Sequence, residues 1–222
     1  LNISAGLAAG LLIALVVATF NGSSSEPALE VWHTSRLSEE FTAEQSIKEV
    51  YNYSKYIEIE ESLFNQLDKK VYAETATGPD QLLNRYSPGS ASDPSSLDPN
   101  WNRSFELQGD GSGGVLLLHG MSDSPYSLRA LGETLNRVGF HVIGLRLPGH
   151  GTAPSGLKYV HWQDMAAAVT LAMEHLYSRL GSDSSSLHII GYSTGASLAL
   201  DYTLKALEGK FASMPDSLVL VS

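Results

Sequence analysis

Leu187-His188-Ile189-Ile190-Gly191-Tyr192-Ser193-Thr194-Gly195-Ala196-Ser197-Leu198-Ala199-Leu200 is the stretch that decides the fold of this chain. An apolar run typical of a buried strand leads into Gly-x-Ser-x-Gly, and a run typical of a helix follows. We predict a strand over 186–192 and a helix from Thr194 to about Leu207, joined by a tight turn at Ser193. Glycines two residues before and after that serine let strand and helix approach without an intervening Cβ. The turn would present the serine hydroxyl at the carboxyl edge of a sheet, beside the positive end of the helix dipole.

The chain from residue 101 onward shows the same alternation of short apolar runs and longer helical stretches. Further strands are predicted over Arg103–Leu107, Val115–His119, Phe140–Leu145 and Ser217–Val221, and further helices over 124–139 and Trp162–Leu180. This order is the signature of βαβ units, so the expected fold class is α/β with a mostly parallel central sheet.

The helix over 124–139 is predicted from its ends as well as from its apolar spacing. Ser124 is expected to be its N-cap, Pro125 its first residue and Gly139 its end. The side chains expected to face the core are those of Leu128, Leu131, Leu135 and Val138.

Three further motifs accompany the predicted strands. His119-Gly120-Met121 follows the strand over 115–119, Leu147-Pro148-Gly149-His150-Gly151 follows the strand over 140–145, and Trp162-Gln163-Asp164 opens the next helix. Together with Gly191–Gly195, in this order, they resemble the α/β-hydrolase superfamily over about residues 103–222. Within that superfamily the motifs are similar to those of the monoacylglycerol lipase, carboxylesterase and serine aminopeptidase (S33-like) group.

The resemblance implies acyl-transfer chemistry. Ser193 would be the nucleophile, and the backbone N–H groups of Met121 and Thr194 would form the oxyanion hole that stabilises a tetrahedral intermediate. This chemistry requires neither a cofactor nor a metal, and none is expected. The alternative for Ser193 is a glycine-flanked surface turn with a spectator hydroxyl, which the flanking strand and helix disfavour.

The other matching residues would shape the site rather than react. The elbow and turn residues implied by the resemblance are Gly191, Tyr192, Gly195, His119 and Gly120. His150 would be a loop residue near the site rather than the catalytic base. Asp164 is expected to be a helix-start or local hydrogen-bonding residue.

The chain also departs from the family pattern, in which an acid and then a histidine follow the serine. No histidine follows Ser193, and the acidic residues Asp201, Glu208 and Asp216 fall on the next helix or just before the last strand. A serine without a base is a poor nucleophile. We therefore expect the sequence to be the N-terminal part of a serine hydrolase, and to be nearly inactive alone.

The resemblance ranks carboxylic esters or acylglycerols first among the possible substrates. A serine aminopeptidase of the S33 type is the second enzymatic possibility, because it shares the same acyl-transfer machinery. The alternative from another class is a non-catalytic, membrane-anchored hydrolase-like protein that acts in binding or as a scaffold.

Residues 1–20 carry no charge, and at about 1.5 Å per residue a helix of that length spans about 30 Å, close to the thickness of a bilayer core. We favour an uncleaved transmembrane anchor over a cleaved signal peptide, whose apolar region is usually shorter. No Lys or Arg precedes Arg36, which is compatible with an extracytoplasmic hydrolase domain. If the segment is cleaved, the protein is secreted.

Between the anchor and the hydrolase region we predict a linker over 21–41, a helical extension over 42–77 and an irregular connector over 78–100, with the hydrolase part over 101–222. The helical extension is predicted from the spacing of Ile47, Val50, Tyr51, Ile57, Leu63, Leu67 and Val71. Fourteen Lys and Arg residues against 24 Asp and Glu residues give a net charge of -10, which argues against nucleic acid as a partner. The chain has no cysteine, which excludes disulfides and a thiol nucleophile.

Overall fold

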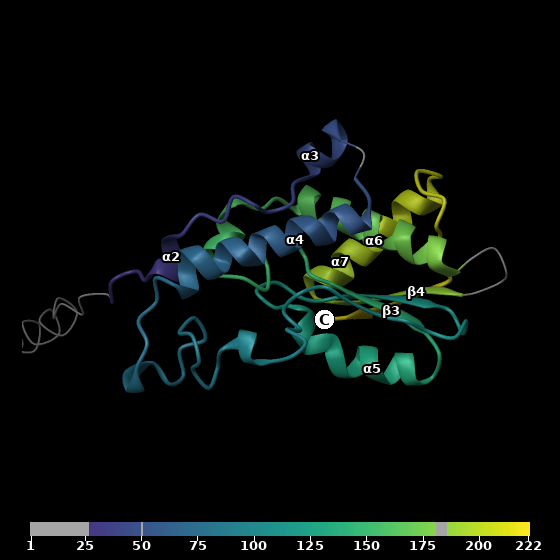
Figure 1. Cartoon of the computed structure of the whole chain (residues 1–222). Helices are drawn as coiled ribbons and strands as arrows, with labels where there is room; N and C mark the ends of the chain where they lie inside the picture. The colour runs from purple at the N-terminus through teal and green to yellow at the C-terminus, as the bar shows by residue number, and fades with distance from the viewer. Residues whose placement is uncertain (1–26, 50, 181–185) are drawn as a thin grey trace, which may run out of the picture. The chain divides into compact units, whose positions relative to one another are not determined.

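A computed structural model describes residues 27–49, 51–180 and 186–222 (Figure 1). The chain divides into two units, Leu1–Glu30 and Val31–Ser222. The anchor predicted over residues 1–20 lies outside the described residues. In the three described ranges, no helix combines the length and the apolar character that a membrane crossing requires.

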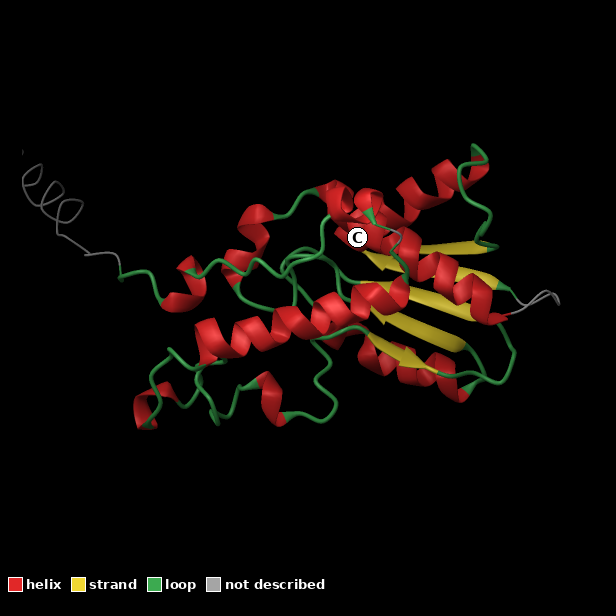
Figure 2. Cartoon of the chain, turned by 45° about the horizontal axis from the view of Figure 1, so that its top comes forward, coloured by secondary structure: helices red, strands yellow, loops and turns green. Residues whose placement is uncertain are grey.

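The second unit is built on a sheet whose strands run in the order β1-β3-β2-β4-β5 in the described part of the chain. The strands are β1 (Phe105–Leu107), β2 (Gly114–Leu118), β3 (His141–Leu145), β4 (Leu187–Tyr192) and β5 (Ser217–Val221). Strands β2 to β5 pair in parallel, and β1 pairs with β3 in the antiparallel direction. The predicted mostly parallel sheet is therefore confirmed, and the turns that leave β2, β3 and β4 share one edge of it (Figure 2).

Helices cover both faces of this sheet (Figure 1). Helix α5 (Arg129–Arg137) lies on one face, and α6 (Trp162–Leu180) and α7 (Thr194–Leu207) lie on the other. Alternate residues of β2 point to opposite faces, as a strand requires. Leu116 and Leu118 join the core cluster of α6 and α7, whereas Val115 and Leu117 pack with Leu128 and Leu135.

The predicted core stripe of α5 is partly wrong. Leu131 is 38% exposed and Val138 is 63% exposed, whereas Leu128 and Leu135 pack against the sheet. A 3₁₀ turn over Pro125–Leu128 precedes the α-helix, and the buried position between the two leucines is Gly132. The face toward the sheet is thus a stripe with i, i+4, i+7 spacing, and Leu131 lies beside it.

Ser124 does occupy the N-cap position before the 3₁₀ turn, but its side chain makes no capping hydrogen bond. Its Oγ instead donates to Oδ1 of Asn102 at 2.6 Å. The hydroxyl therefore ties this turn to the segment that precedes β1.

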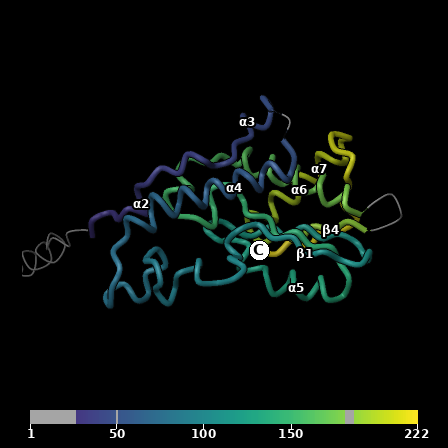
Figure 3. The backbone as a smooth tube through the Cα atoms, viewed as in Figure 1, coloured from purple at the N-terminus to yellow at the C-terminus, as the bar shows by residue number. Residues whose placement is uncertain are grey.

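The predicted helical extension contains α3 (Ala43–Lys48) and α4 (Tyr53–Leu67), which continues as a π-helical turn over Asp68–Tyr72, and a short helix α2 (Val31–Thr34) lies within the predicted linker. Helix α4 lies alongside α6 on the same side of the sheet (Figure 3). Thr42 caps α3 through a hydrogen bond from the Gln45 amide, and Asn52 caps α4 through one from the Lys55 amide.

The apolar face of α4 is buried, as predicted for this segment. Tyr56 belongs to the main core cluster, and Leu63 and Leu67 belong to a second cluster with Val71. The prediction fails at Ile47, which is 84% exposed, because α3 is only six residues long and turns this side chain away from the core. Val50 lies outside the described residues.

The predicted linker is partly packed into the core, whereas the predicted connector is irregular. Leu37 and Phe41, within the predicted linker over 21–41, are buried, so the packed unit begins earlier in the chain than expected. The connector over 78–100 is irregular and contains 3₁₀ turns at Pro79–Gln81 and Pro94–Ser96, and a further 3₁₀ turn lies at Pro154–Tyr159.

Candidate active site

Ser193 occupies the turn between β4 and α7 in a strained backbone conformation. Its φ of 51° and ψ of -113° place it in a region that residues with a Cβ rarely adopt. Such strain costs on the order of 1–3 kcal/mol and persists only where the surroundings hold it. The Ser193 amide donates to the carbonyl oxygen of Val221 at 2.7 Å, and the Ser193 carbonyl accepts from Ala196 at 3.0 Å. The side chain itself is exposed.

The two glycines of the elbow are required by close backbone approach. A Cβ at Gly191 would lie 2.4 Å from the carbonyl oxygen of Gly195. A Cβ at Gly195 would lie 2.2 Å from the carbonyl oxygen of Leu118. Both distances are far below ordinary van der Waals contact, so any side chain here would push α7 away from the sheet.

The turn after β2 lies directly beside the elbow. A Cβ at Gly120 would come within 2.9 Å of the Tyr192 ring and 3.4 Å of Ser193 Cβ. Met121 follows at the surface, and among the described residues neither its amide nor that of Thr194 has a hydrogen-bond acceptor. Both N–H groups predicted for the oxyanion hole are thus free to donate.

His119 is fully buried at the base of this turn, with one ring nitrogen bonded on each side. Its Nε2 accepts the Leu147 amide at 3.1 Å, so its Nδ1 carries the proton and donates to the carbonyl oxygen of Gly120 at 2.8 Å. Burial lowers the pKa of His119 to about 3. Because Nε2 already accepts the Leu147 amide, it has no free lone pair with which to accept the Ser193 proton.

His150 lies next to His119, with the two ring centroids 5.1 Å apart. Its Nδ1 donates to the carbonyl oxygen of Pro148 at 2.9 Å, and burial lowers its pKa. It lines a cavity of about 310 Å³ between the loops that follow β2 and β3, together with Ser122 and Arg85. His150 is therefore a buried loop residue close to the turn that follows β2.

Asp164 lies in the first turn of α6 and connects this helix to the helical extension. One carboxylate oxygen accepts from the His161 amide and the other accepts from the Ala43 amide, both at 2.8 Å. The first bond is the helix-start role predicted for it. The second bond, to a residue 121 positions earlier in the chain, could not be read from local sequence.

No histidine in the described ranges is hydrogen-bonded to the hydroxyl of Ser193. His141 and His175 both contact Glu106, and His188 contacts Ser186 and Ser217. The three acidic residues after the elbow are engaged elsewhere, since Asp201 pairs with Lys205, Glu208 with Lys210, and Asp216 with the Leu187 amide. The described ranges also contain no group of three or more acidic or histidine side chains able to hold a metal ion.

Sequence reasoning missed a buried ion cluster beside the site. Arg146 follows β3 and is completely buried, with Glu40 and Glu60 bonded to its guanidinium. A charged residue between an apolar strand and a glycine-rich loop was the available signal, because a buried arginine needs carboxylate partners. The identity of those partners could not be read, since they lie 106 and 86 residues away in the chain.

Comparison with known proteins agrees with this arrangement. A family model described as the alpha/beta hydrolase fold matches residues 114–219. A thermostable monoacylglycerol lipase of Bacillus sp. (strain H-257) is 34% identical over 91 residues, which cover 41% of this chain and 35% of the lipase. The chain thus spans about a third of the length of that relative.

Solved structures of similar proteins include lipolytic enzymes. A structure described under "LipS and LipT, two metagenome-derived lipolytic enzymes" is 30% identical, with a TM-score of 0.46, over 54% of this chain and 45% of that one. The monoacylglycerol lipase of Paleococcus ferrophilus is 21% identical, with a TM-score of 0.40, over 53% of this chain and 41% of that one. The match over residues 114–219 takes in β2, β3 and β4 with the turns that carry the Met121 amide and Ser193, and over this range the chain is similar to the α/β-hydrolase superfamily.

Proposed function

We propose that the protein is a serine hydrolase that cleaves carboxylic esters, with acylglycerols as the favoured class, by acyl transfer through Ser193. The observation that carries this proposal is the strained, exposed conformation of Ser193 beside two free backbone amides. Strain at a surface serine is costly and is retained where it positions a reacting group. The lipase and esterase relatives support ester hydrolysis as the general activity.

In this mechanism Ser193 Oγ attacks the ester carbonyl while a base accepts its proton. The carbonyl oxygen becomes an oxyanion, which accepts hydrogen bonds from the amides of Met121 and Thr194. Loss of one such donor typically lowers the rate on the order of 10²–10³-fold. The intermediate collapses, the alcohol leaves with the proton, and water then hydrolyses the acyl-serine by the same steps.

We place the base and its acidic partner outside these 222 residues. In the described chain, His119 and His150 are held in turn-shaping contacts, and the acids after the elbow have other partners. The chain also spans only 35% of the lipase it resembles. A protein that ends at Ser222 is therefore expected to show almost no turnover.

Membrane attachment through residues 1–20, with the hydrolase unit outside the cytoplasm, is part of the proposal. Its support is the uncharged run and the lack of Lys or Arg before Arg36. Protease treatment of intact cells tests it. We expect the hydrolase unit to be cleaved, and full protection would overturn the proposed orientation.

The substrate class is tested by hydrolysis assays on the full-length natural protein. A short-chain nitrophenyl ester, a monoacylglycerol and an aminoacyl-nitroanilide are compared for wild type, Ser193→Ala and a version that ends at Ser222. We expect wild type to cleave both esters and the other two proteins to cleave none. Cleavage of the nitroanilide alone would favour an aminopeptidase, and no cleavage by a folded wild-type protein would favour a binding or scaffold role.

A further inference from the structure

Glu40, just before the helical extension, and Glu60, within it, both bind a buried arginine of the loop after β3. Arg146 is fully buried and donates from Nη2 and Nη1 to the two carboxylate oxygens of Glu40, at 2.9 and 3.0 Å. This is a two-point fork, the strongest arrangement between an arginine and a carboxylate. Arg146 Nε donates to Glu60 at 2.9 Å, so a second carboxylate, on α4, fixes the same guanidinium.

Glu40 holds the loop after β3 as well as the arginine. Its Oε2 accepts the amide of Gly149 at 2.8 Å. Arg146 adds a hydrogen bond to the carbonyl oxygen of His150 at 3.2 Å. The Glu40 side chain is only 12% exposed, so these bonds lie in a largely water-free environment. Glu40 and Arg146 therefore hold two neighbouring residues of this loop, Gly149 and His150.

The same loop fixes the imidazole of His119. Leu147, next to Arg146 in the chain, donates its amide to His119 Nε2 at 3.1 Å. An N–H group that points at Nε2 requires a lone pair there and thus places the ring proton on Nδ1. The position of residue 147 therefore selects the tautomer of a side chain in the oxyanion turn.

The tautomer in turn orients the proposed oxyanion donor. Nδ1 of His119 donates to the carbonyl oxygen of Gly120 at 2.8 Å. That carbonyl and the N–H of Met121 belong to one peptide plane and point in opposite directions in a trans peptide. Holding the Gly120 carbonyl against the buried imidazole therefore aims the Met121 N–H away from it.

We propose that Glu40 is a positioning residue for the oxyanion turn, acting through Arg146, the loop after β3 and the fixed tautomer of His119. The inference rests on the proposed function, because it takes the Met121 amide as an oxyanion donor. It assigns a residue just before the helical extension a part in catalysis that its distance from Ser193 in the sequence would not suggest. Misplacement of a catalytic group by about 1 Å can lower the rate on the order of 10²-fold.

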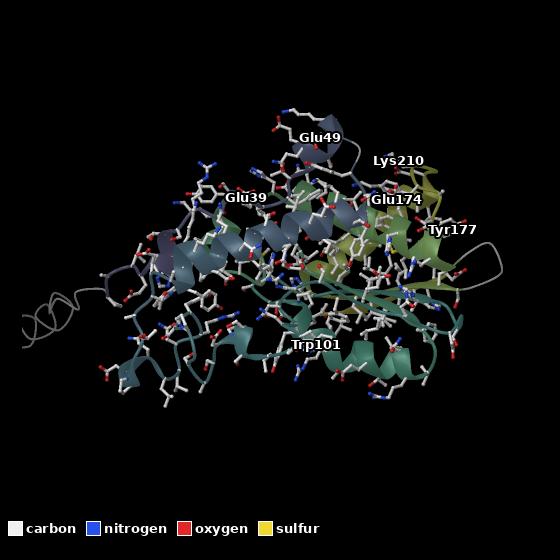
Figure 4. The ribbon with its side chains drawn as sticks, viewed as in Figure 1. Glu39, Glu49, Trp101, Glu174, Tyr177 and Lys210 are labelled. Carbon is white, nitrogen blue, oxygen red and sulfur yellow. The ribbon has the colours of Figure 1, made fainter. Side chains whose placement is uncertain are left out.

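The experiment measures ester hydrolysis by the full-length natural protein with Glu40→Gln, Glu40→Asp and Glu39→Gln. Glu39 is the matched control, because it is adjacent and exposed (Figure 4). We expect Glu40→Gln to lower kcat at least 10-fold with KM changed less than twofold, and Glu39→Gln to leave both unchanged. Glu40→Asp keeps the charge beside Arg146 but shortens the side chain, so it should fold and still lower kcat.

If Glu40 only stabilised the fold, its substitution would leave the tautomer of His119 unchanged. ¹⁵N spectra of histidine-labelled protein should show Nδ1–H at His119 in wild type and a changed pattern in both Glu40 variants, at temperatures where they are folded. Unchanged kcat and unchanged ¹⁵N shifts in a folded Glu40→Asp protein would overturn the relay. Full activity of Ser193→Ala would instead overturn the proposed function, so the two failures are distinguishable.

Discussion

Gly195 on α7 approaches the end of β2 so closely that a Cβ on it would come within 2.2 Å of the carbonyl oxygen of Leu118. This contact sets how near Ser193 lies to the turn that carries the Met121 amide. The elbow geometry thus depends on a glycine that makes no contact with substrate in the proposed mechanism.

Gly195→Ala is expected to lower the free energy of unfolding by about 1–3 kcal/mol, because the added methyl group must displace backbone. Urea unfolding followed by circular dichroism measures this. Gly209→Ala is the matched control, since a Cβ there has no atom within 4 Å and only its φ of +76° is unfavourable. Equal losses for the two variants would contradict a steric cause at Gly195.

The buried imidazole of His119 predicts a loss of stability on acidification. Its pKa is about 3 in the folded protein because burial disfavours the charged ring, whereas an unfolded histidine titrates near ~6.5. Between these values the unfolded chain binds more protons than the folded chain. The free energy of unfolding therefore falls as pH drops from about 6.5 toward 3, by up to ~1.4 kcal/mol per pH unit from this group.

Urea unfolding at pH 7, 6 and 5 checks the slope. His119→Asn removes one titrating ring and should make the pH dependence shallower, leaving the part that the buried His150 contributes, whereas substitution of the exposed His161 by Gln should not change it. The same slope in wild type and His119→Asn would show that His119 is not the group responsible.

In the Glu40–Arg146–Glu60 cluster, we expect each carboxylate to contribute to the free energy of unfolding. Burial opposes the charged guanidinium, but the two carboxylates and Tyr56 outweigh it and hold the pKa of Arg146 well above its usual range. Glu60→Gln leaves Arg146 paired with Glu40 but removes the charged acceptor of its buried Nε–H group, so this substitution should lower the free energy of unfolding by about 1–3 kcal/mol.

Chemical denaturation of Glu60→Gln and of Glu44→Gln provides the comparison. Glu44 pairs with Lys48 on the surface of α3, where both side chains are largely exposed. No measurable change is expected for that variant. A Glu60→Gln protein as stable as wild type would mean that Arg146 does not depend on its second carboxylate.

The parts of the fold that follow local rules could be predicted from the sequence. The strand, turn and helix around Ser193 were predictable because apolar period, glycine spacing and element length all agree there. The apolar stripe of α5 could be predicted only in part, because a 3₁₀ turn before the helix and a buried Gly132 set which residues face the sheet. A glycine carries no apolar signal although this position is buried.

The contacts that join distant segments could not be predicted at all. Glu40 and Arg146 are 106 residues apart, and Glu40 reads in isolation as a solvated charge. The antiparallel direction of β1 was likewise invisible, since three residues of apolar pattern carry no information on their partner. These features arise from packing of whole elements rather than from local propensity.

The central claim is that Ser193 is the nucleophile, and the most direct measurement maps a covalent adduct. The full-length natural protein is treated with a fluorophosphonate, digested, and the modified peptide is identified by mass spectrometry. The account predicts a phosphonate on Ser193 that is absent after Ser193→Ala and after prior denaturation. An adduct on another residue, such as Ser197, or an unmodified Ser193 in a folded protein that cleaves esters, would contradict it.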